Sequence, residues 1–502
     1  VKEPELNNVK LKSPTKKREV AMARWLLILG MVLALVACAP APTPAPPTAT
    51  PAAPPPAATP APPTPTPPPR EVVLTAWTIG PEQASHFRAD NLTAAAEALN
   101  KALEAEGLNI RVKVDASFDT STWDEYRQRF ILAAQAGNAP DIILSGHEDT
   151  APWSEAGFIV PLDDWIRKYE AQTGLKDIFP TLWNAVTYKG QRWAVPQDTE
   201  ARPMFFSKTL LKKLGWSDEE IQALPERIRT GQFTLMDLLR VAKEAQDKGV
   251  VKPGYGYWTR PRRGLDFYQF YIAFGGQLQD PQTGKLVLVQ EALRKHFQFH
   301  YDTVFTYGTT PKNFIGTDWS TWHQTVSAGD QVLFWNGGTW HWGQWLTQFG
   351  RQEPDLWANI GFALIPAGEP GQKPTTLSHP LVYMVTSEKA SGKKNQELAF
   401  RLIAMATTPE LNTRHAVQSA HLAILKTQLD DPEYKKAQFL QQTAYMVEYA
   451  TYAPNHADFS AYDEVVWTAL SAVMGGEMKP DQAVEMVVKE LQARLGDKVI
   501  IR

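Results

Sequence analysis

The sequence predicts an α/β fold organised in two lobes, and three observations support this. Beyond residue 70, strand-like segments alternate with helix-like ones, which is the order of βαβ units around a largely parallel sheet. This part of the chain has about 430 residues, more than one hydrophobic core usually organises. The residues before it form a short apolar run and a proline-rich run, and neither can build such a core.

The leader has the pattern of a secretion signal. Residues 1–24 carry seven Lys or Arg and three Glu, and the uncharged run 25–37 follows. Its thirteen residues are too few to cross a membrane as a helix, which takes about 20. They suit the core of a signal peptide instead. Translation could begin at Val1 or at Met22.

The apolar run ends at Cys38, the only cysteine of the chain. The stretch LVAC at 35–38 resembles the lipobox of bacterial lipoproteins. This resemblance implies cleavage before Cys38 and acylation of its thiol and new amino group, and several acyl chains would hold the protein firmly at a membrane. An uncleaved membrane helix with an incidental cysteine is the alternative.

A spacer separates Cys38 from the folded part. Residues 39–69 consist of Ala, Pro and Thr, and sixteen of these 31 residues are Pro. Proline lacks an amide donor and fixes φ, so we expect a polyproline II tether. At about 3.1 Å per residue it would reach roughly 90 Å. Because no other cysteine follows, the folded part has neither disulfides nor a cysteine metal site.

Charge and composition narrow the class of partner. The net charge is −3 and the leader contributes +4, so the remainder carries −3 − 4 = −7. This balance argues against nucleic acid as a partner, and no basic stripe with interleaved aromatics is present. The chain has 17 Trp, and so many suggest a site that uses flat apolar faces.

The first lobe is predicted from three strands and the helices after them. The runs VVLTAW (72–77) and DIIL (141–144) have strand composition, and NIRVKV (109–114) alternates apolar and polar residues. Helical patterns end at Gly107 and Gly137, residues suited to a helix stop. Ser121 and Asp124 have the spacing of a capping box. We expect helices over 85–106, 121–136 and 165–172.

Strand and helix patterns alternate again further along. Thr234 and Asp237 form another capping box. The predicted strands are 255–258, 331–335 and 361–365, the predicted helices begin near 234 and span 267–274, and the chain is mostly helical from 395 to 495.

Six passages stand in a fixed order between residues 136 and 495. They are AGNAPDIIL (136–144), GFIVPLDDWI (157–166), KGQRWAVPQDTEARPMFFSKTLLKKLG (189–215), SAGDQVLFWNGGTWHW (327–342), FALIPAG (362–368) and GGEMKPDQAVEMVVKELQARL (475–495). Together they resemble the extracellular solute-binding proteins of ABC transporters, the family that contains maltose-binding protein.

The resemblance implies two lobes joined by a multi-strand hinge, which close on a ligand and deliver it to a membrane permease. It implies a monomeric lipoprotein, in the periplasm or at the outer face of the cytoplasmic membrane. The expected divisions are a signal peptide (1–37), the lipidated cysteine with its linker (38–70), the first lobe (71–198 and 361–420) and the second lobe (199–360 and 421–502).

Loops at strand ends should line the crevice between the lobes, because parallel strands direct their carboxyl ends to such a crevice. A sugar presents an apolar C–H face to an aromatic ring and hydroxyls to charged groups. Trp77, Trp258 and Trp340 are the aromatic candidates, although each Trp could equally fill a core. The candidates for polar or close contacts are Ser145, His147, Asp149, Asp198, Arg202, Arg260, Gly338, His379 and Tyr462.

The nature of the ligand stays open among several classes. TRPRRG (259–264) is either a solvated turn or an anion clamp, since Arg binds carboxylate or phosphate in a bidentate way. An anion clamp would suit a phosphorylated or acidic sugar. A peptide and a polyamine are further alternatives to a neutral carbohydrate.

Catalytic patterns are missing from the sequence. It contains no H-E-x-x-H, G-x-S-x-G or G-x-x-x-x-G-K-[ST], and its ten His show no metal spacing. Asp163 and Asp164 are adjacent on a predicted helix and point in different directions, so they do not form a carboxylate pair. We expect a binding protein without cofactor or metal, and an anchored glycoside hydrolase is the alternative from another class.

Overall fold

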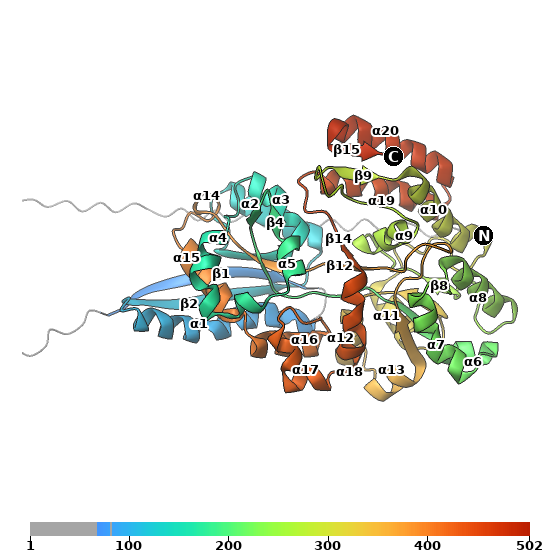
Figure 1. Cartoon of the computed structure of the whole chain (residues 1–502), viewed down its shortest axis with the longest axis horizontal. Coiled ribbons are helices and arrows are strands. Elements are labelled where there is room, and N and C mark those ends of the chain that lie inside the picture. The colour runs from blue at the N-terminus through green and yellow to red at the C-terminus, as the bar shows by residue number, and fades with distance from the viewer. Residues whose placement is uncertain (1–67, 81–82) are drawn as a thin grey trace, which may run out of the picture. The chain divides into compact units, whose positions relative to one another are not determined.

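The computed structural model describes residues 68–80 and 83–502. The signal peptide, Cys38 and nearly all of the spacer lie outside the described residues. The described part holds two hydrophobic cores, one for each lobe. Figure 1 shows the two sheets and their helices, with β12 (Thr376–Ser378) and β14 (Ala450–Tyr452) between them.

The first lobe is built on a five-stranded sheet. The strands, in the order in which they lie, are β2 (Ile110–Asp119), β1 (Arg70–Ile79), β3 (Ile142–Gly146), β13 (Leu381–Val385) and β6 (Val195–Pro196). β1 pairs in parallel with β2 over its full length and with β3, whereas β13 is antiparallel to β3 and β6. The helices of this lobe are α1 (Phe87–Ala105), α2 (Trp123–Gln135), α3 (Thr150–Glu155), α4 (Asp163–Tyr169), α5 (Pro180–Ala185), α14 (Glu388–Ser391), α15 (Gln396–Ala406) and α16 (Pro409–Ser419).

The second lobe is built on a four-stranded sheet. Its order is β11 (Ile360–Ala363), β7 (Met204–Ser207), β10 (Phe334–Asn336) and β8 (Tyr257–Trp258), with β7 antiparallel to both neighbours and β10 parallel to β8. The helices are α6 (Lys208–Leu214), α7 (Asp218–Arg229), α8 (Leu235–Asp247), α9 (Tyr268–Ala273), α10 (Gln290–Tyr301), α11 (Trp319–Ser327), α12 (Trp340–Thr347), α13 (Glu353–Asn359), α17 (Pro432–Lys436), α18 (Gln438–Thr443), α19 (Phe459–Gly475) and α20 (Pro480–Leu495).

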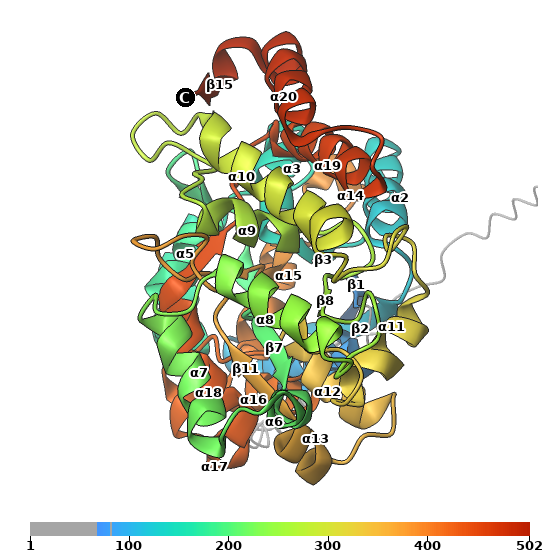
Figure 2. The ribbon, with the colours of Figure 1, turned by 90° about the vertical axis from the view of Figure 1, so that its right-hand side faces the viewer.

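Three two-stranded sheets complete the described part. β4 (Thr187–Tyr188) pairs with β5 (Gln191–Arg192), β9 (Leu286–Leu288) with β15 (Val499–Ile501), and β12 with β14. The last pair lies where the chain crosses between the lobes. In the second lobe, α10 and α19 both pack against α20, as Figure 2 shows from the side.

The chain passes between the two cores several times. It leaves the first core after Val195 and enters the second at Ala201, and it returns between Leu377 and Leu381. The expected return was at residue 361. It comes later because β11 pairs with β7 of the second sheet, so residues 360–377 stay with the second lobe. After α15 it crosses again: Ala416 and Ala420 belong to the second core, Ile424 and Leu425 to the first, and Tyr434 to the second.

Local capping explains where several helices begin. Thr234 caps α8 in a capping box with Asp237, as predicted. The start of α2 differs from the prediction by one residue. Thr122, not Ser121, accepts from the backbone N of Glu125, and the Glu125 side chain accepts from the backbone N of Thr122 in return. A full capping box forms only at this register.

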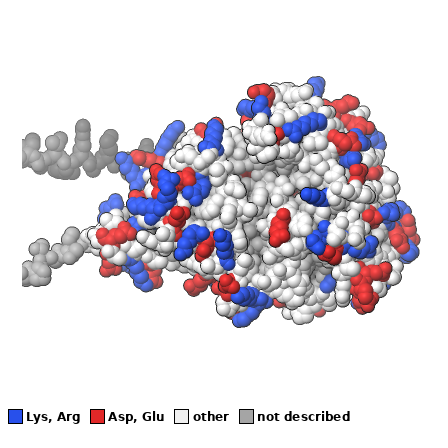
Figure 3. All heavy atoms as spheres, in the orientation of Figure 1, with Lys and Arg blue, Asp and Glu red and all other residues white. Residues whose placement is uncertain are grey.

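Among the described residues, no helix is both long enough and apolar enough to cross a membrane. On the face shown in Figure 3, acidic and basic side chains are mixed over both lobes and form no basic patch.

Candidate functional site

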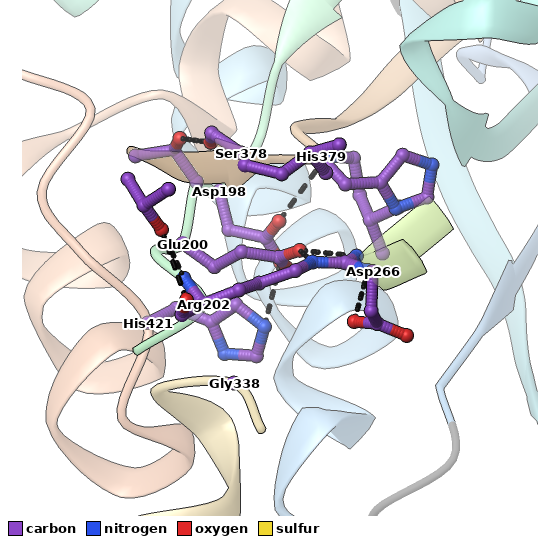
Figure 4. A network of polar contacts seen from close by, with 12 residues as sticks. Asp198, Glu200, Arg202, Asp266, Gly338, Ser378, His379 and His421 are labelled. Carbon is purple, nitrogen blue, oxygen red and sulfur yellow. Dashed lines mark hydrogen bonds and ion pairs between the residues drawn. The ribbon is translucent and has the colours of Figure 1, made fainter. Parts of the chain in front are cut away.

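Five predicted loops converge between the two sheets because of the strand directions. β3, β6, β8 and β10 end there, and the antiparallel partners β13 and β7 begin there. The segment between β6 and β7 passes from one sheet to the other. It is joined to the last residue of β12 by a 2.8 Å hydrogen bond between the hydroxyls of Thr199 and Ser378. Figure 4 shows this polar network.

Arg202 is the centre of a buried ion network. Its Nη1 donates to Asp266 Oδ1 at 2.5 Å, and its Nη2 donates to Glu200 Oε1 at 2.7 Å. Arg260 Nη1 binds the other oxygen of Asp266 at 2.5 Å. Burial alone would raise the pKa of Asp266, but the two guanidinium groups hold it below its usual value. Both carboxylates in this network are therefore neutralised by arginine.

Two tryptophans lie against these guanidinium groups. The Arg202 guanidinium carbon is 5.2 Å from the centre of the Trp340 ring, and that of Arg260 is 5.2 Å from Trp319 and 5.6 Å from Trp340. Arg262 lies 3.5 Å over Trp319. Arg202, Arg260, Asp266, Trp319 and Trp340 are called the Trp340 cluster below. The ion network fixes the arginines, and they in turn fix the rings.

The loop before α12 allows this arrangement because of a glycine. A Cβ on Gly338 would lie 1.8 Å from the Trp340 ring, so only glycine lets the indole approach the backbone here. The backbone N of Gly338 donates to His341 Nδ1 at 3.2 Å. Trp340 is thus held at the first turn of α12, with 6% of its surface exposed.

The Trp340 cluster has hydrogen-bonding capacity that the described residues do not use. Buried polar groups in proteins are nearly always paired, and exceptions indicate an absent partner such as water or a ligand. The buried atoms without a partner in and around the cluster are Thr259 Oγ1, Arg260 Nε, Trp319 Nε1, Thr339 Oγ1, Trp340 Nε1 and His341 Nε2.

Asp198 lies in a second ion network, in which its carboxylate is saturated, although His415 Nδ1 has no partner among the described residues. Arg88 binds its Oδ2 through Nε at 3.0 Å and Nη2 at 2.8 Å, and His415 Nε2 lies 2.9 Å from the same oxygen. The backbone N of Leu381 donates to Oδ1 at 3.3 Å. Burial would raise the pKa of Asp198, but Arg88 and the neighbouring imidazoles, including His421, hold it far below its usual value. Arg88, Asp198, His415 and His421 are called the Asp198 cluster below.

The turn after β3 carries the remaining polar candidates of the first lobe. Ser145 Oγ donates to Asp149 Oδ2 at 2.5 Å, and Arg127 Nε binds the same carboxylate at 2.7 Å. His379 Nε2 lies 2.7 Å from Glu148 Oε2. The field of His379 also lowers the pKa of Glu200, although burial raises it overall.

Three of the predicted site residues lie elsewhere. Trp258 packs on Tyr255 and Phe314 at ring distances of 4.9 and 5.1 Å, and its Nε1 donates to the Gly254 carbonyl. The Tyr462 hydroxyl donates to the Val287 carbonyl inside the second core. Trp77 is half-buried on β1, and the guanidinium carbon of Arg129 lies over it, 4.8 Å from the centre of the Trp77 ring. These contacts favour structural roles for all three.

Several site residues were not identified from the sequence. Glu200 lies inside a predicted loop, and Arg262 and Asp266 lie in or next to TRPRRG. A search for acidic partners of the predicted arginines could have found the two carboxylates. Trp319 and Glu148 had no comparable signal.

One cavity lies away from this site. Its volume is about 870 Å³, and it lies beside β14, lined by residues that include Tyr188, Gln277, Tyr452 and His456. None of the predicted site residues lines it. We place the candidate site at the Trp340 cluster because unpaired polar atoms gather there.

Comparisons with known proteins agree with this architecture. The chain is 22% identical over 368 residues to the maltotriose-binding protein of Pyrococcus abyssi, covering 72% of each chain. Maltose-bound MalE3 of Thermotoga maritima shares the fold with a TM-score of 0.66 and 21% identity, covering 84% of this chain and all of that one. Maltotriose-bound MalE of Bdellovibrio bacteriovorus gives a TM-score of 0.64 at 18% identity, with 84% and 100% covered.

These structures confirm the two-lobe α/β fold that the sequence predicted. Residues 89–413 match the family described as bacterial extracellular solute-binding protein, which is more than half of the chain. The chain therefore belongs to the bacterial extracellular solute-binding protein family.

Proposed function

We propose that this protein captures a carbohydrate between its two lobes and delivers it to the permease of an ABC importer. The observation that carries the proposal is the Trp340 cluster. It combines indole rings with buried polar atoms that have no partner among the described residues. A saccharide presents the matching groups, since its C–H face packs on an aromatic ring and its hydroxyls pair with charged side chains.

Closure of the two lobes follows from the same arrangement. A ligand that contacts both lobes binds the closed state more tightly and shifts the population towards it. Glu148 follows β3 and His379 precedes β13 of the first sheet, whereas Arg260 follows β8 and Trp340 follows β10 of the second. The relatives named above support the ligand class, because their names or titles record maltose or maltotriose.

A thermal-shift screen followed by calorimetry tests the proposal. Neutral mono- and oligosaccharides, sugar phosphates, acidic sugars, peptides and polyamines are compared at equal concentrations. A ligand at 100 times its Kd should add about 2.7 kcal/mol of stability. Stabilisation by a peptide or polyamine alone would contradict the carbohydrate proposal. Turnover of an oligosaccharide, rather than stoichiometric binding, would indicate the glycoside hydrolase alternative.

A specific observation favours an acidic or phosphorylated sugar as the second candidate. Three guanidinium groups, those of Arg202, Arg260 and Arg262, face two carboxylates, those of Glu200 and Asp266. Arg262 has no ion-pair partner among the described residues. An anionic ligand would balance the surplus charge, since Arg matches carboxylate and phosphate groups.

The membrane anchor is a proposal on the sequence alone. A Cys38→Ala variant should leave an uncleaved or soluble protein, while its affinity for the ligand stays unaltered because the spacer separates the anchor from the lobes. Membrane fractionation together with calorimetry checks both parts. Membrane association of the variant after removal of its signal would contradict lipidation at Cys38.

A further inference from the structure

We propose that His147, Glu148 and His379, called the His147 cluster below, form a site for a divalent transition metal such as Zn²⁺. His147 and Glu148 belong to the turn η2 (His147–Asp149) directly after β3, and His379 lies between β12 and β13. One ligand atom of each residue lies within 4.8 Å of the other two. Nitrogen and oxygen ligands of this kind are those that zinc takes in proteins.

His147 is held in the form that binds a metal. Its side chain is fully buried, and Nε2 lies 3.0 Å from the carbonyl oxygen of Ala453. A carbonyl only accepts, so Nε2 carries the proton and Nδ1 keeps its lone pair. A backbone carbonyl that fixes the outer nitrogen in this way is the usual second-shell partner of a metal-binding histidine.

The inner nitrogen of His147 is the independent sign of a missing partner. Nδ1 is buried and has no hydrogen-bond partner among the described residues, and Glu148 Oε2 lies 3.6 Å from it. A buried acceptor left unpaired is costly, and a metal ion at this position would satisfy it.

The other two ligands are close to the required distances. Zinc lies about 2.0 to 2.2 Å from nitrogen and carboxylate ligands, so two ligands of one tetrahedral ion are about 3.3 Å apart. The pair Glu148 Oε2 and His147 Nδ1 is near this separation. Glu148 Oε2 and His379 Nε2, 2.7 Å apart, would move slightly apart as the ion replaces their hydrogen bond.

Arg127 orients the Glu148 carboxylate and leaves one of its two oxygens available to a metal. Its Nη2 binds the other oxygen of Glu148, Oε1, at 2.5 Å, which orients the carboxylate and leaves Oε2 for the metal. Side chains of His379 and Glu148 are 12% and 14% exposed, so an ion could enter from the space between the lobes. Three protein ligands leave a fourth position open.

A second group of potential metal ligands, in the Asp198 cluster, does not support a metal site. Ligand atoms of Asp198, His415 and His421 also lie within 4.8 Å of one another. There, however, the Arg88 guanidinium already binds Asp198 Oδ2 through two nitrogens. A cation could not share that oxygen without displacing the buried arginine, so the proposal rests on the His147 cluster alone.

The test uses the tag-free, chelator-treated chain titrated with ZnCl2 in the absence of any sugar, so it does not depend on the proposed function. We expect one Zn²⁺ per chain by calorimetry and a rise in melting temperature. Co²⁺ should give the visible absorption of a site with nitrogen ligands. Loss of a ligand in His147→Gln or His379→Gln should weaken binding at least about 100-fold, the upper end of what a lost second-shell partner costs.

His86→Asn is the matched control. His86 Nδ1 lies 2.6 Å from Asp90 on the surface, a histidine–carboxylate pair without a third ligand, so this variant should bind Zn²⁺ like the parent. No binding by the parent, or unchanged binding in His379→Gln, overturns the proposal. If His147→Gln fails to fold by circular dichroism, His379→Gln decides, because that side chain is partly exposed.

Discussion

The Asp198 cluster and the Trp340 cluster are both buried ion networks between the two sheets, yet they differ in what they leave unused. Asp198 accepts from Arg88 and from backbone, and His415 lies against it, so its carboxylate is saturated. The Trp340 cluster also pairs its carboxylate with arginine, but its indole nitrogens and Arg260 Nε have no partner among the described residues.

This difference indicates a structural role for the Asp198 cluster and a binding role for the Trp340 cluster. The Asp198 cluster joins α1, the crossing after β6 and the end of α16, and its one buried atom without a partner among the described residues is His415 Nδ1. In the Trp340 cluster the ion pairs serve to hold flat rings and free donors in place. A buried charged residue between the lobes is therefore a candidate ligand contact only where some hydrogen-bonding capacity is not used by the protein's own hydrogen bonds.

The largest effect is expected from breaking the Asp198 cluster. Asp198→Asn would leave the buried Arg88 uncompensated and should lower the free energy of unfolding by about 3–5 kcal/mol. Ligand affinity, measured where the variant is still folded, should change little. Chemical denaturation and calorimetry check this. A large loss of affinity with stability intact would make Asp198 a contact.

The same variant should alter the pH dependence of stability. Asp198 has a folded pKa far below its unfolded value of about 3.9, so its contribution is complete above that value and is lost as pH falls. His415, whose pKa burial lowers, adds a loss below about pH 6.5 because the unfolded histidine takes up a proton first. Below about pH 4, unfolding should show a shallower decline in Asp198→Asn than in the parent.

Trp258→Ala tests whether Trp258, unlike Trp340, belongs to the hydrophobic core and not to the binding site. Its indole is 4% exposed and its nitrogen is already bonded, so truncation should cost about 3–5 kcal/mol of stability through the cavity it leaves. Affinity should stay near the parental value. A variant that keeps its melting temperature but no longer binds would return Trp258 to the binding site.

Arg262→Gln should have a smaller and selective effect. Because Arg262 is exposed and stacked on Trp319, its removal should weaken an acidic or phosphorylated sugar by about 1 kcal/mol or less. The loss should shrink at high salt, and a neutral sugar should bind as before. Calorimetry with a matched neutral and acidic pair measures the difference. Equal losses for both ligands would argue against an anion subsite.

The sequence was sufficient for the architecture because local signals and global order agreed. The strand runs and the capping box at Thr234 needed no tertiary information, and the order of the six family-like passages implied the two lobes. The return crossing was misplaced, because the pairing of β11 with β7 depends on a partner more than 150 positions away.

The site could be predicted only in part, for a similar reason. Loops at strand ends identified Arg202, Arg260 and Trp340. Whether a tryptophan meets the ligand or the core depends on neighbours such as Phe314, which packs on Trp258 and lies far from it in sequence. His147 and His379 were predicted as site residues, but their grouping with Glu148 was not, because Glu148 and His379 are 231 positions apart and no local spacing encodes the group.

The central claim is that Trp340 packs on the ligand, and calorimetry of Trp340→Ala beside Trp258→Ala tests it most directly. The titrant is the carbohydrate with the largest thermal shift, at a temperature where both variants are folded. We predict that Trp340→Ala loses about 2 kcal/mol or more of binding free energy, as central aromatic anchors do, while Trp258→Ala binds like the parent. Parental affinity in Trp340→Ala would contradict the account and place the stacking surface elsewhere.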